Sequence, residues 1–242
     1  MLILLGAALL AILVIVANVA RSGSQVRGVE VAVRYGDTPT LVSDQVVVDT
    51  VLRRMPNLLQ RQVKDVSTGQ VAEAAARVPF LTNVSAALSV SGKVVIRADQ
   101  RRPIARIYYG SRQLYIDREG ALFPISRLGN CNVLVAGGNF TEPLRVDSLN
   151  AQLQALWKLA CFIDDEKDYR YLIDQIFVER DGDLMMVPKV GSHVIEVGTP
   201  DNLEEKFDNL IAFYRKGMPR AGWDTYSKIS LKFKDQVVCT KR

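Results

Sequence analysis

The first pattern along the chain is an apolar run from Leu2 to Ala20 in which Asn18 is the one polar residue. As a helix it would be about 28 Å long, close to the roughly 30 Å hydrocarbon core of a bilayer. A cleaved signal peptide is the alternative, but its apolar region is shorter, about 7 to 15 residues, and ends in small residues. The pattern therefore predicts that residues 1–20 form an uncleaved transmembrane helix.

The residues that flank this helix leave its orientation open. No Lys or Arg precedes it, whereas Arg21 and Arg27 follow it. The positive-inside rule alone would keep the C-terminal side in the cytoplasm, but two charges are a weak signal. Residues 21–26 are polar and include Gly and Ser, so they are predicted to be a linker.

Within residues 27–100, apolar residues recur at every second position in some segments and at every third or fourth position in others. This pattern predicts the order strand, helix, helix, strand, strand. Ser43 and Ser67 are candidate helix N-caps, and Pro56 and Pro79 end the two helices. The strands are expected at Val29–Val33, Val84–Val90 and Lys93–Ala98. Two helices over one face of such a sheet form a compact α+β domain.

Residues 101–242 show short strands around two amphipathic helices, so the overall class is α+β with a β-rich second domain. One helix follows Ser148 as a possible cap, and the other opens at Thr199-Pro200. The apolar residues of Tyr226–Val238 alternate with polar ones, which predicts a long final strand. The remaining strands are expected at Ile104–Tyr109, Gln113–Ile116, Ala121–Phe123, Val133–Ala136, Asp174–Glu179, Leu184–Val187 and His193–Val197.

Charge and cysteine content narrow the function classes. The net charge of +5 is spread among acidic residues, which is typical of a solvated surface and argues against nucleic-acid binding. Cys131, Cys161 and Cys239 form no CxxC pair, which excludes a disulfide-rich scaffold and a four-cysteine zinc site. One disulfide stays possible, but small buried side chains are the favoured interpretation of all three.

Candidate chemistry is sparse. His193 is the one histidine and has no nucleophile motif beside it, so a structural role is favoured. Asp164-Asp165-Glu166 lacks the glycine and spacing of a calcium loop, and we expect a solvated loop at a helix end. Phosphate-loop, dinucleotide, zinc-protease and serine-hydrolase motifs do not occur. We therefore predict no catalytic, cofactor-binding or metal-binding residues, and a binding or scaffold role.

Four segments carry a resemblance to a known family: Val78–Val84, Lys93–Ala98, Gln100–Ile107 and Tyr115–Pro124. In this order after an apolar N-terminal helix, they resemble the bacterial cell-division protein family FtsQ/DivIB. The resemblance implies one transmembrane helix, a POTRA-like domain at 27–100 and a β domain at 101–242 that ends in a partner-binding strand. Family members also carry a basic cytoplasmic tail, whereas this sequence starts inside the helix.

The resemblance further implies a non-enzymatic divisome scaffold of the cell inner membrane, with its N-terminus cytoplasmic and its body periplasmic. The implied partners are small division proteins like FtsB and FtsL and other divisome members. The residues to which this partner-binding role is carried are Tyr226, Ile229, Leu231, Lys232, Phe233 and Gln236. For Ile229, Leu231 and Phe233, a place in the core is an equally good interpretation.

Two other function classes stay open at this point. A POTRA-bearing chaperone or translocation component for outer-membrane proteins would need a β-barrel or further POTRA repeats. An enzyme of the cell envelope would need a catalytic cluster. Neither feature is visible in the sequence.

Overall fold

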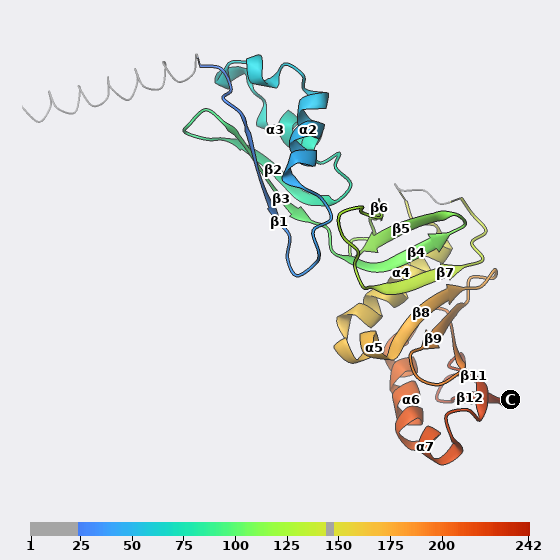
Figure 1. Ribbon diagram of the computed structural model, residues 1–242. Helices are drawn as coiled ribbons and strands as arrows, with labels where there is room; N and C mark the ends of the chain where they lie inside the picture. The colour runs from blue at the N-terminus through green and yellow to red at the C-terminus, as the bar shows by residue number, and fades with distance from the viewer. Residues whose placement is uncertain (1–23, 144–147) are drawn as a thin grey trace, which may run out of the picture. The chain divides into compact units, whose positions relative to one another are not determined.

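The computed structural model describes residues 24–143 and 148–242, which form a mixed α+β protein with more strands than helices (Figure 1). The chain divides into two compact units. The first comprises residues up to Arg101 together with Ser126–Asn130, and the second comprises Arg102–Ile125 and Cys131–Arg242. The predicted transmembrane helix, Leu2–Ala20, lies outside the described residues. Within those residues, no helix has the length and apolar character needed to cross a membrane.

The first unit has the predicted order of elements, with two added 3-10 turns. They are β1 (Val29–Arg34), α2 (Asp44–Arg54), η1 (Leu58–Gln60), η2 (Val63–Asp65), α3 (Thr68–Ala75), β2 (Leu81–Leu88) and β3 (Val94–Gln100). Strand β3 is central: β1 pairs with it in parallel and β2 antiparallel. The expected strand–helix–helix–strand–strand order is therefore confirmed.

Burial of one face of each helix holds this unit together. Val47 and Val51 of α2 and Val71 of α3 are fully buried with Ile96 of β3 in one apolar cluster. Ser67 caps α3 as predicted, because its hydroxyl accepts a hydrogen bond from the Gln70 N–H at 3.3 Å. Ser43 precedes α2 but makes no such bond.

The second unit is built on one nine-stranded sheet. Its strands are β4 (Pro103–Tyr109), β5 (Arg112–Asp117), β6 (Leu122–Pro124), β7 (Leu134–Gly138), β8 (Ile173–Val178), β9 (Leu184–Pro188), β10 (Val194–Gly198), β11 (Tyr226–Ser230) and β12 (Val238–Lys241). Its helices are α4 (Ala151–Asp165), α5 (Lys167–Leu172), α6 (Leu203–Lys216) and α7 (Met218–Ala221). The strand order is β12-β11-β10-β9-β8-β7-β4-β5-β6, so β12 and β6 are its edges.

Parallel strand pairs explain where the helices of this unit lie. Strands β7 and β8 are parallel neighbours, and so are β10 and β11. Parallel neighbours need a long crossover connection, and here α4–α5 and α6–α7 provide it. Leu156 of α4 and Phe207 of α6 are fully buried in the same cluster as Ile176, Met186 and Ile229 of the sheet.

Both long helices of the second unit begin later than predicted. Helix α4 is capped by Asn150 instead of Ser148, because the Asn150 Oδ1 accepts from the Leu153 N–H at 2.9 Å. Helix α6 begins at Leu203 instead of Pro200. The Lys206 Nζ donates to the Val197 and Thr199 carbonyls at 2.9 and 2.7 Å. These bonds hold the chain just before the helix, where residues 199–202, including Pro200, form a bend.

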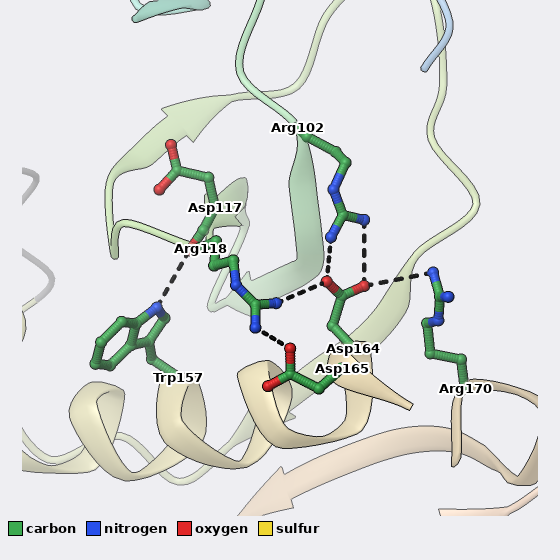
Figure 2. A network of polar contacts seen from close by, with 7 residues as sticks. All are labelled: Arg102, Asp117, Arg118, Trp157, Asp164, Asp165 and Arg170. Carbon is green, nitrogen blue, oxygen red and sulfur yellow. Dashed lines mark hydrogen bonds and ion pairs between the residues drawn. The ribbon is translucent and has the colours of Figure 1, made fainter. Parts of the chain in front are cut away.

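The expectation of a solvated acidic loop at Asp164–Glu166 is wrong for Asp164. Its side chain, in the last turn of α4, is only 6 % exposed. Figure 2 shows three arginines converging on it: Arg102 before β4, Arg118 after β5 and Arg170 in α5. Arg102 donates to both carboxylate oxygens, one bond measuring 3.2 Å, and Arg118 donates at 3.4 Å. This single carboxylate therefore joins α4 to three other segments.

Two further contacts support the same junction (Figure 2). The Trp157 Nε1 donates to the Asp117 carbonyl at 3.2 Å, and the half-exposed Asp165 pairs with Arg118. One face of α4 thus lies against the turn that follows β5.

We expect Asp164→Asn to lower the free energy of unfolding by about 1 to 3 kcal/mol, because three arginines lose their shared anion. This value lies below that of a fully buried ion pair, since the arginines are about half exposed. Asp165→Asn is the matched control and should cost less than about 1 kcal/mol, as for exposed pairs. Urea-induced unfolding of both variants measures the difference, and equal losses would contradict the central role of Asp164.

Candidate partner-binding edge

Strand β12 forms one edge of the nine-stranded sheet. It pairs antiparallel with β11, with Cys239 opposite Ile229 and Val238 opposite Ser230. Among the described residues, no other strand pairs with it. An edge strand keeps a row of backbone N–H and C=O groups on its open side. β12 is therefore a place where another extended segment can be added to the sheet.

One backbone hydrogen bond indicates which residues face the open side. The Arg242 N–H donates to the Thr225 carbonyl at 3.2 Å, so Arg242 faces the β11 side. Successive residues of a strand direct their backbone groups to opposite sides. Cys239, in the regular part of the ladder, consequently directs its N–H and C=O groups away from β11, whereas the Lys241 carbonyl accepts a hydrogen bond from the Ser227 hydroxyl of β11 at 3.4 Å.

The predicted long strand Tyr226–Val238 is wrong, because β11 ends at Ser230 and Val238 already belongs to β12. The ladder between β10 and β11 ends at Leu231, and the chain then turns. The Leu231 N–H donates to the Glu196 carbonyl at 2.8 Å, and Asp235 has a positive φ of 56° within a turn. Lys232 and Lys234 therefore lie in the β11–β12 loop, and not at outward positions of a strand.

The six residues expected to contact a partner separate into buried and exposed groups. Ile229 and Leu231 are almost fully buried and belong to the core of the second unit. Tyr226 is half-buried, and its ring lies 5.9 Å from that of Phe213. Phe233 is 55 % exposed and Gln236 is exposed. For Ile229 and Leu231 the core interpretation holds, whereas Phe233 is outside the core.

Lys232 fixes the start of the β11–β12 loop. Its Nζ lies 2.5 Å from Asp183 Oδ2, and this hydrogen-bonded carboxylate raises the pKa of Lys232. Its aliphatic stem lies across Gly198, where an added Cβ would be 2.8 Å from the Lys232 Cγ. Gly198 has a φ of +72°, so both backbone and space favour glycine there. The loop is thus anchored to the sheet before it reaches β12.

Sequence reasoning did not find β12 as a separate strand. The signal was available, since Lys234-Asp235-Gln236 is a polar break between two apolar stretches. The regular alternation of Ile229, Leu231 and Phe233 concealed that break.

The second unit matches a known family. The model of the family described as "FtsQ/DivIB, C-terminal related" matches residues 102–240, from the start of β4 through most of β12. The chain belongs to this FtsQ/DivIB-related family. No curated protein matches the sequence. Membership in FtsQ/DivIB indicates a role in cell division, and the candidate edge lies in the part of the chain that the family model matches.

The cysteines of this FtsQ/DivIB-family chain are free thiols. Cys131 is buried and Cys161 and Cys239 are half-buried, in line with the expected small packed side chains. Burial raises the pKa of all three thiols, that of Cys161 to about 11. They are therefore protonated near neutral pH.

His193, at the start of β10, is buried as a structural residue would be. It is 1 % exposed, and its Nε2 lies 2.6 Å from the Tyr214 hydroxyl. Its Nδ1 has no hydrogen-bond partner within the described part of the chain. Burial, with a smaller effect of nearby Arg242, lowers the pKa of His193. A neutral imidazole therefore suits this site.

We expect Ile229→Ala to lower the free energy of unfolding by about 2 to 5 kcal/mol, as for large-to-small changes in a packed core. Phe233→Ala should change it by about 0.5 kcal/mol or less, because the exposed ring leaves no cavity. Urea-induced unfolding measures both. A large loss for Phe233→Ala would mean that Phe233 belongs to the core after all.

A second prediction concerns acid stability. Because the pKa of His193 is lower in the folded than in the unfolded protein, the unfolded state binds more protons below about pH 6.5. The contribution of His193 to the free energy of unfolding should be fully present above that pH. Below it, the free energy of unfolding should fall by up to about 1.4 kcal/mol per pH unit. His193→Gln should remove this part of the acid sensitivity in urea melts at pH 7.5, 6.5 and 5.5. An unchanged acid dependence would exclude His193 as its source.

Proposed function

We propose that this protein is a non-enzymatic scaffold of bacterial cell division that binds other membrane division proteins during septum formation. The observation that carries the proposal is an open sheet edge, β12, inside the region matched by the FtsQ/DivIB-related family. Three features of the sheet favour strand addition there: β12 has one neighbouring strand among the described residues, Cys239 has outward backbone groups, and the loop that precedes β12 is anchored to the sheet.

In this proposal, Leu2–Ala20 is a single-pass anchor in the cell inner membrane. The N-terminus is cytoplasmic and the body periplasmic. The apolar run and the family resemblance support this placement. The first unit serves as a POTRA-like docking module, supported by its strand–helix–helix–strand–strand order and its central β3.

The proposed partners are FtsB- or FtsL-like division proteins, which add an extended segment to β12. The outward backbone groups of Cys239 bind that segment, as in other strand-addition complexes. Lys232, Phe233 and Gln236 contact it from the β11–β12 loop, whereas Ile229, Leu231 and Tyr226 support the edge from within. Lys241 at the edge also disfavours pairing with unrelated strands.

Depletion of the protein in its own organism tests the proposal. The expected result is filaments without septa, with outer-membrane proteins still assembled. Normal septation would overturn the scaffold role. Loss of assembled outer-membrane proteins with normal septation would instead favour the chaperone alternative.

We expect Cys239→Pro to weaken partner capture by about tenfold or more. Proline removes one outward N–H and places its ring on the open edge, while the bonds to β11 remain. Cys239→Ala is the matched control, because it loses the thiol but keeps the N–H. Co-purification with the FtsB- and FtsL-like proteins measures capture. Equal capture by the two variants would exclude strand addition at β12.

A further inference from the structure

The second unit contains a pocket of about 360 Å³ far from β12 in the strand order. It lies between the beginnings of β4, β7 and β8 on one side and α4 and α5 on the other. Ile104, Ile163 and Ile173 contribute apolar walls from β4, α4 and β8. The exposed ring of Tyr171 stands at its margin. The three isoleucines are at most 3 % exposed, so they form the closely packed floor of the pocket, and its accessible rim is mainly polar and charged.

Positive charge dominates the polar part of this pocket. Its lining includes four cationic side chains, Arg102, Lys167, Arg170 and Lys189, and two carboxylates, Asp164 and Asp174. Asp164 is already shared among three arginines (Figure 2). The excess of cations indicates an anionic ligand.

Two of these cations retain hydrogen-bond donors. The Arg170 guanidinium lies 3.7 Å from Asp164 Oδ1, beyond hydrogen-bonding distance, and donates no bond to any described residue. Figure 2 shows it on the side of Asp164 opposite Arg118. The Lys167 Nζ lies 5.9 Å from the centre of the Tyr171 ring and has no carboxylate partner among the described residues. Both groups line the pocket.

We propose that this pocket binds an acidic side chain of a partner polypeptide. Its carboxylate would sit between Lys167 and Arg170, above the floor formed by Ile104, Ile163 and Ile173, and an apolar neighbour in the partner's sequence would pack on the exposed ring of Tyr171. A planar guanidinium fits a carboxylate well, and a hydrogen bond between two charged groups is stronger than one between neutral groups.

The pocket favours a carboxylate over a phosphate. A phosphate carries about two negative charges, which strengthens both the attraction of the cations and the repulsion of Asp164 and Asp174, so charge alone does not choose between the two anions. A phosphate has three acceptor oxygens, more than Lys167 and Arg170 can face at once. Its oxygens would also face the three isoleucines. The site lies on other elements than β12, so it adds a second contact to the proposed scaffold and does not depend on strand addition.

Isoleucine methyl NMR on the full chain in a mild detergent tests this site directly. The probes are the capped peptides acetyl-Leu-Glu-Leu-amide and acetyl-Leu-Gln-Leu-amide, with inorganic phosphate as a third arm. The Glu peptide should shift the Ile104, Ile163 and Ile173 signals saturably, with a dissociation constant on the order of 1 mM for so small a ligand. Ile96 and Ile229, outside the pocket, should not move.

Substitutions that spare Asp164 complete the test. Lys167→Gln should weaken binding of the Glu peptide about threefold, and Lys167→Gln with Arg170→Gln about tenfold or more. Lys216→Gln, an exposed lysine on α6, is the matched control and should leave binding unchanged. Equal binding of the Glu and Gln peptides, tighter binding of phosphate, or no shift at the three isoleucines would each overturn the proposal. Pocket variants should still capture partners at β12, so failure here is distinguishable from failure of the scaffold role.

Discussion

The buried carboxylate of Asp164 is the contact on which the arrangement of the second unit depends. Taking a carboxylate out of water is costly unless its oxygens are paired. Here the pairing groups come from Arg102, Arg118 and Arg170, on three different segments of the chain. One anion therefore positions the crossover helix α4 against the beginning of β4 and the turn after β5. It also holds Arg170 at the mouth of the neighbouring pocket.

The same crossover geometry determines which parts of the sheet are open. Helices α4 and α6 occupy their places because β7–β8 and β10–β11 are parallel pairs. That leaves β6 and β12 as edges, and both are short. Short edges limit indiscriminate pairing. The Lys232–Asp183 contact and the Leu231–Glu196 backbone bond hold the start of the β11–β12 loop against the sheet. They therefore help to fix the position of the edge strand β12.

Local patterns predicted much of this fold, because alternation and helical periodicity directly record which side chains are buried. They failed where a buried position lies outside regular structure. Leu231 is buried beyond the end of β11, so the alternation continued and suggested a longer strand. The contacts of Asp164 could not be predicted from the sequence, for a different reason. Nothing local to Asp164 shows that Arg102, 62 residues earlier, lies beside it. An acidic run therefore looked solvated, and the pocket next to it was not anticipated.

The two proposed contacts differ in what they can recognise. Strand addition at β12 uses backbone groups, which every non-proline residue possesses, so it supplies affinity with little selectivity. Selectivity must come from side chains that accept one partner and penalise others. The pocket beside Asp164 is proposed to supply that selectivity, because Lys167 and Arg170 would hold a Glu carboxylate better than a Gln amide. The proposed scaffold would use both kinds of contact, since β12 lies at one end of the strand order and β4, β7 and β8, which line the pocket, lie elsewhere in the sheet.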